Sequence, residues 1–131
     1  MKKIGVLNKD ISELIASMGH FDQLTICDAG LPIPEHVWRI DLAVKEGLPG
    51  FVEVAKAVAN DMVIQQIILA EEIKKASPHI DKQVRDIFVG VEVVYIPHDA
   101  FKEQSTKSRA IIRTGEFTPY SNLIIVSGVS F

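Results

Sequence analysis

The sequence has 131 residues, one cysteine and a formal net charge of -3 at pH 7. Charges of both signs are mixed along the chain, which leaves no basic stripe for nucleic acid and no polybasic patch for a membrane surface. The apolar segments are too short for a signal peptide or a bilayer span, and the lone Cys27 excludes an internal disulfide. We therefore expect a cytoplasmic protein of one domain that binds a small neutral or polar ligand.

The chain is apolar for its length. Hydrophobic residues make up 47% of it, and the mean hydropathy is +0.20. Copies of the chain that cover part of each other's surface would explain these values. An apolar core alone would also account for them.

Helix and strand patterns alternate in the first half of the chain. Apolar residues at positions 11, 14, 15 and 18 have helical spacing, and Asn8 or Asp10 is placed to cap that helix. Gly19 sits where a helix C-cap is expected. The following pattern predicts a short buried strand over 24–27, an extended loop at 31–34, a strand over 37–42 and a helix over 51–60.

The second half continues the alternation. We expect a strand over 62–70, a short helix over 71–76, a helix opening at Ser77-Pro78 and stopping at Gly90, a strand over 91–96 and a short helix over 98–104. Two late strands, 109–113 and 122–126, flank a turn over 115–121. No repeat or linker interrupts residues 1–131. The sequence predicts a single α/β domain with a central, mostly parallel sheet flanked by helices.

The stretch from Met18 to Pro32 holds the first candidate site residues. His20 follows the Gly19 cap and is expected on the rim of the fold, where it can act as a general acid or base. Asp28 ends the apolar run, so we expect the strand to bring both groups into one neighbourhood. A plain surface histidine is the alternative for His20. A turn in which Asp28 accepts hydrogen bonds from the next two amides is the alternative for Asp28.

Further polar residues lie at the ends of later strands. His98 follows Pro97 and could merely open a helix capped by Asp99, while Tyr120, Ser121 and Asn122 could form a polar turn. A tyrosine face, an amide and a carboxylate are nevertheless the groups that hold a sugar, because the ring stacks on C–H bonds and the others pair with hydroxyls. The motifs of dinucleotide sites, P-loops, zinc proteases and serine hydrolases are all missing.

Four sequence segments together carry a resemblance to a known family. They are Gly19-His20-x-Asp22, the run from Cys27 to Pro34, Ala70-Glu71-Glu72-Ile73 and the run from Gly115 to Asn122. In this order, spread over almost the whole chain, they resemble the ribose pyranase and fucose mutarotase family. The Gly30-Leu31-Pro32-Ile33-Pro34 loop is similar to the ribose branch.

The resemblance implies an enzyme of sugar uptake and catabolism that interconverts the β-pyranose and β-furanose forms of D-ribose. It also implies a ring-shaped homodecamer with sites at subunit boundaries. Carried over to this sequence, His20 is the proton donor, and Asp28, His98 and the segment Tyr120-Ser121-Asn122 bind the sugar. Lys102 joins this set because it lies one helical turn beyond His98.

Opening a hemiacetal requires one proton to leave the anomeric hydroxyl and one to reach the ring oxygen, so no cofactor or metal is expected. One positioned acid or base contributes roughly 10²- to 10⁴-fold to such a reaction. Two other functions stay open: a sugar-binding accessory protein of a transporter, without turnover, and a metal enzyme with His20, Asp28 and His98 as ligands.

Overall fold

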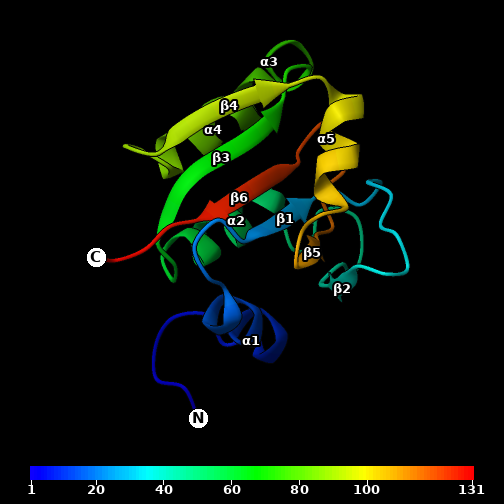
Figure 1. The fold of residues 1–131 in the computed structure, drawn as a ribbon. Helices are drawn as coiled ribbons and strands as arrows, with labels where there is room; N and C mark the ends of the chain where they lie inside the picture. The colour runs from blue at the N-terminus through cyan, green and yellow to red at the C-terminus, as the bar shows by residue number, and fades with distance from the viewer.

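The computed structural model describes residues 1–131 as one domain built on a six-stranded sheet (Figure 1). The strands are β1 (Gln23–Cys27), β2 (Trp38–Asp41), β3 (Ile64–Ala70), β4 (Glu92–Ile96), β5 (Ala110–Arg113) and β6 (Leu123–Ser127). The helices are α1 (Lys9–Ser17), α2 (Phe51–Ala59), α3 (Ile73–Ala76), α4 (Pro78–Ile87) and α5 (His98–Ser105). No helix is both long enough and apolar enough to cross a bilayer.

The strand order is β2-β5-β1-β6-β3-β4, and β6 alone runs antiparallel to its neighbours. The predicted mostly parallel sheet is therefore confirmed, with one reversed strand near its centre. β5 and β6, which flank the predicted turn, are separated in space by β1. Because β6 is reversed, its first residues lie at the same edge of the sheet as the carboxyl ends of β1 and β3.

Most helix boundaries follow local signals. The Asn8 side chain accepts a hydrogen bond from the Ile11 amide at 3.0 Å, which confirms the predicted cap of α1. Three other caps are corrected. Met18, not Gly19, is the C-cap of α1. Ser77 precedes α4, but its hydroxyl donates to the Pro119 carbonyl at 2.6 Å instead of capping the helix. Pro97 is the N-cap of α5, and Asp99 pairs with Lys102 at 3.1 Å.

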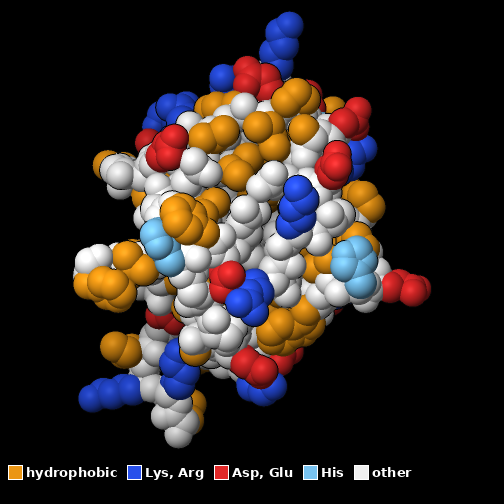
Figure 2. All heavy atoms as spheres, in the orientation of Figure 1, with side chains coloured by type: hydrophobic (Ala, Val, Ile, Leu, Met, Phe, Trp, Pro, Cys, Tyr) orange, Lys and Arg blue, Asp and Glu red, His pale blue; other side chains and the backbone are white.

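The two faces of the sheet are covered unequally. Helices α1 to α4 pack on one face over a cluster of 20 buried residues, whereas α5 and the loop after β1 cover a cluster of nine on the other. Apolar side chains also gather on the surface over β3 and β4 (Figure 2). Val94 and Ile96 of the edge strand β4 are only partly buried there.

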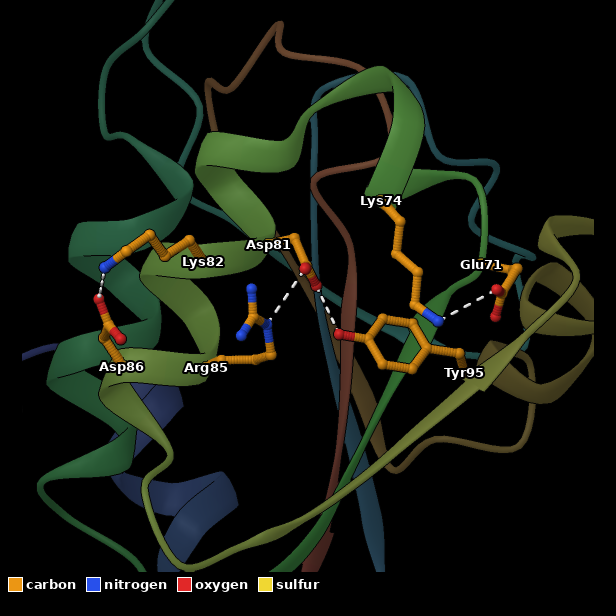
Figure 3. Close-up of polar contacts among 7 residues, drawn as sticks. All are labelled: Glu71, Lys74, Asp81, Lys82, Arg85, Asp86 and Tyr95. Atoms are coloured by element: carbon orange, nitrogen blue, oxygen red, sulfur yellow. Dashed lines mark hydrogen bonds and ion pairs between the residues drawn. The ribbon is translucent and has the colours of Figure 1, made fainter.

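Helix α3 is fixed to the fold by the polar contacts in Figure 3. The Lys74 ammonium lies 3.9 Å from the centre of the Tyr95 ring and 3.1 Å from the Glu71 carboxylate. The Tyr95 hydroxyl donates to Asp81 of α4 at 2.6 Å, and Arg85 pairs with the other Asp81 oxygen at 3.1 Å. Burial, together with the hydrogen bond to Asp81, raises the pKa of Tyr95 to about 12, so this hydroxyl stays a donor.

Candidate functional site

A cavity of about 290 Å³ opens at the edge of the sheet where β1 and β4 end and β6 begins. Three segments meet there: the loop after β1, the first turn of α5 and the loop before β6. The lining residues are Asp28, Gly30, Leu31, Pro32, His98, Pro119, Tyr120 and Asn122. A second, larger hollow of about 720 Å³ shares Tyr120 with it as a lining residue. The edge therefore has room for a small polar molecule.

Asp28 and Asn122 hold each other in place across 94 residues of sequence. The side-chain Nδ2 of Asn122 donates to Asp28 Oδ2 at 3.1 Å, and the side-chain Oδ1 of Asn122 accepts from the Asp28 backbone N–H at 2.9 Å. Asp28 Oδ1 accepts from the amides of Gly30 and Leu31 at 3.0 and 2.9 Å. The predicted turn is thus present but shifted by one residue, and the carboxylate faces the cavity in a fixed orientation.

His98 and Tyr120 form an aromatic wall of the cavity. Their rings meet edge to face, with centroids 5.0 Å apart and planes at 88°. Glu72 holds the start of α5, because its carboxylate accepts the His98 backbone N–H at 2.8 and 3.2 Å. Tyr120 has a left-handed backbone, with φ of 60°, which turns the chain sharply into β6. The Nδ1 atom of His98 is buried and has no partner within the chain.

Two predicted binding residues do not line this cavity. Ser121 is 0% exposed, and its hydroxyl is buried without a hydrogen-bond partner. Lys102 lies one turn beyond His98 on α5, as predicted, but its ammonium pairs with Asp99. Their roles in binding stay predictions.

His20 lies at the opposite end of β1 from Asp28, which corrects the expectation that the strand brings the two together. The five residues of β1 span roughly 13 Å at about 3.3 Å per residue. The His20 imidazole contacts Gln65 at 2.8 Å and stacks on Phe21, with centroids 3.9 Å apart. Since His20, Asp28 and His98 do not meet within one chain, they form no shared ligand set there, and no cluster of three potential metal ligands occurs in residues 1–131.

Glu116, which the sequence did not single out, anchors the loop that carries Tyr120. Its carboxylate accepts from the Phe51 amide at 3.1 Å and from the Thr118 hydroxyl at 2.8 Å, and its backbone carbonyl accepts from Ala29 at 2.9 Å. Burial alone would raise the pKa of Glu116, but the hydrogen bonds from Thr118 and Phe51 outweigh it and lower the pKa. The ionised carboxylate therefore ties the two cavity loops to α2.

Replacing Glu116 by glutamine should lower the free energy of unfolding by about 1–2 kcal/mol at pH 7, because hydrogen bonds to a charged acceptor are lost. Because the pKa of Glu116 is lower in the folded protein than the usual 4.5, its ionised carboxylate stabilises the fold above pH 4.5. This contribution to stability is lost as the pH falls through the pKa of Glu116 in the folded protein. Urea unfolding at pH 7 and near pH 4 should show the difference shrinking in acid. The exposed Glu46 offers the matched change Glu46→Gln, for which we expect no such difference.

Gly115 opens the same loop at a point with no space for a side chain. A Cβ there would lie 2.5 Å from the Lys45 carbonyl oxygen and 2.6 Å from that of Leu48. Gly115→Ala should therefore cost about 1–3 kcal/mol of stability, since backbone must move. A Cβ at Gly30 meets nothing closer than 3.7 Å, so Gly30→Ala should unfold at nearly the wild-type urea concentration. Equal midpoints for the two variants would contradict this account.

Comparison with known proteins extends these observations. The model of the RbsD / FucU transport protein family matches residues 1–130. Proteins named D-ribose pyranase from Psychromonas ingrahamii and Bacillus cereus strain ATCC 10987 are 46% and 49% identical, each over 100% of both chains. The structure of Bacillus subtilis RbsD complexed with D-ribose superposes with a TM-score of 0.97 at 43% identity, covering 100% of both chains.

A more distant structure shares the fold. FucU from Bifidobacterium longum has a TM-score of 0.80 at 23% identity, with 95% of this chain and 96% of that chain covered. The full-length family match and the high identity to curated relatives agree with the motifs and with the cavity that they line. This chain belongs to the RbsD / FucU transport protein family.

Proposed function

We propose that this chain is a D-ribose pyranase, an isomerase that interconverts the β-pyranose and β-furanose forms of D-ribose and so supports ribose uptake and catabolism. The observation that carries the proposal is the full-length similarity to D-ribose pyranases, together with a fold that matches an RbsD–ribose complex at a TM-score of 0.97. The cavity edge supplies groups suited to a sugar: a fixed carboxylate, an amide and a tyrosine ring.

The cavity residues bind and orient the sugar in this proposal. Asp28 and Asn122 pair with hydroxyls, the Tyr120 ring packs on C–H bonds, and the His98 imidazole contacts the sugar from the same wall of the cavity. Ser121 and Lys102 complete the proposed set. His20 acts as general acid and base: it takes the proton of the anomeric hydroxyl as the ring C–O bond breaks, and a proton returns to the ring oxygen, directly or through a hydroxyl or water.

In this proposal a second copy of the chain supplies His20, since Asp28 and His20 of one chain lie at opposite ends of β1. We therefore propose a ring-shaped homo-oligomer, a decamer, with each site at a subunit boundary. Exposed apolar residues around His20 support the proposal that a second subunit covers this surface. Phe21, Val63 and Val129 are 62%, 46% and 37% exposed, and backbone hydrogen bonds hold their segments together. A soluble monomer rarely leaves such apolar side chains clustered in water.

Ring exchange of ribose, measured by saturation-transfer NMR with and without protein and in the presence of a chelator, tests the activity. Faster pyranose-to-furanose exchange is the expected result. The alternative is a sugar-binding accessory protein of a transporter, which is in keeping with membership of the RbsD / FucU transport protein family. That alternative predicts ribose binding without any change in exchange rate. A rate that collapses in chelator would instead indicate a metal enzyme.

We place the protein in the cytoplasm, where the free thiol of Cys27 suits a reducing environment.

A further inference from the structure

Gln65 touches the proposed catalytic histidine directly. Its Oε1 atom lies 2.8 Å from Nε2 of His20. An amide oxygen accepts a hydrogen bond, so this orientation of the Gln65 amide pairs with the imidazole tautomer that carries its hydrogen on Nε2. In the neutral ring, Nδ1 is then the nitrogen with a free lone pair.

The backbone aims Gln65 at His20. The register between β3 and β6 shifts between Ile64 and Gln66, so Gln65 is the extra residue of a β-bulge. Bulges commonly re-aim a side chain next to an active site. The backbone of Gly128 packs closely against the bulge. A side chain added at Gly128 would place its Cβ only 3.4 Å from the Gln65 Cβ.

The His20 loop is fixed to the same strand end. Phe21 donates its amide to the Ser127 carbonyl at 3.0 Å, and Ser127 donates to the Asp22 carbonyl at 2.9 Å. The Asp22 carboxylate accepts from the Gly19 amide at 2.8 Å and pairs with Arg109 at 2.9 Å. The hydrogen bond from Gly19, with the Arg109 pair, lowers the pKa of Asp22, so its charge stays satisfied within the loop. Gln65 and His20 thus face each other across two restrained segments.

We infer that Gln65 is the positioning residue of His20: it holds the Nε2–H tautomer, so protons pass between His20 and the sugar at Nδ1. The inference rests on the proposed pyranase activity and adds to it the atom that exchanges the proton. Gln65 itself touches no reacting atom in this account. Its effect comes through the orientation and tautomer of the imidazole.

Histidine labelled with ¹³C provides the test, because the chain has only four histidines and the ring carbon shifts distinguish the two tautomers. The intact protein should show His20 as the Nε2–H form. Gln65→Leu should lose that preference and slow ribose exchange roughly tenfold, the effect of one hydrogen bond, with little change in KM. Gln66→Leu is the matched control, because Gln66 is the next residue and donates to Glu92 at 2.8 Å.

Gln65→Glu keeps an acceptor in the same place and adds a charge. It should restore exchange relative to Gln65→Leu, because the acceptor for the Nε2–H group is kept. The charged pair of the His20 loop, Asp22 with Arg109, is unchanged in this variant. A leucine variant with unchanged His20 carbon shifts and exchange rate overturns the inference. A wild-type protein that fails to speed exchange overturns the proposed function instead, while the tautomer measurement still decides the role of Gln65.

Discussion

His20→Ala is expected to slow ribose ring exchange by roughly 10²- to 10⁴-fold, the usual contribution of one positioned general acid or base. Ribose should still bind, because the groups proposed to hold it lie at the other end of β1 in the same chain. The side chain is exposed, so its removal should leave the free energy of unfolding nearly unchanged. Saturation-transfer NMR gives the exchange rate, and calorimetric titration with ribose gives the affinity.

His36 provides the control for this change. It is also exposed, and it lies in the loop before β2, away from both His20 and the cavity. His36→Ala should exchange ribose at the wild-type rate. Wild-type exchange in His20→Ala would remove His20 from the mechanism, and a loss of ribose binding in step with the rate would make it a binding residue instead.

Sequence reasoning located the elements well where the signal is local. The Asn8 cap and the helical spacing of apolar residues defined α1, and the β-branched run before Glu71 defined β3. Short-range signals do not specify strand neighbours. The order of β5, β1 and β6 depends on pairing between segments far apart in sequence, since Thr25 of β1 lies opposite both Ile111 of β5 and Ile124 of β6.

Short-range sequence signals also fail to show which site residues lie together. His20 and Asp28 are close in sequence, which suggested a shared neighbourhood, but an extended strand keeps its two ends apart. The pairing of Asp28 with Asn122 joins positions 94 residues apart. Gln65 looks like any polar strand residue, since only the register shift against β6 turns it toward His20. The residue types were predictable from chemistry, whereas their grouping depended on the sheet.

Asn122→Asp should disrupt the cavity strongly. Asn122 is 1% exposed and donates to Asp28 Oδ2 at 3.1 Å. An aspartate there removes the donor and sets two carboxylates against each other, so we expect a loss of about 3 kcal/mol in the free energy of unfolding at pH 8 and at least a tenfold loss of ribose affinity. Urea unfolding and ribose titration measure the two effects.

The pH dependence of the stability loss in Asn122→Asp, and a second substitution that compensates for it, identify the cause of that loss. Two facing carboxylates raise each other's pKa, so one takes up a proton as the pH falls, and that proton restores a donor between them. The loss of stability in Asn122→Asp should therefore shrink between pH 8 and pH 5. Combining it with Asp28→Asn exchanges donor and acceptor, and the turn amides of Gly30 and Leu31 keep an oxygen to bond. The double variant should recover most of the stability at pH 8, whereas a merely steric defect would persist in it at every pH.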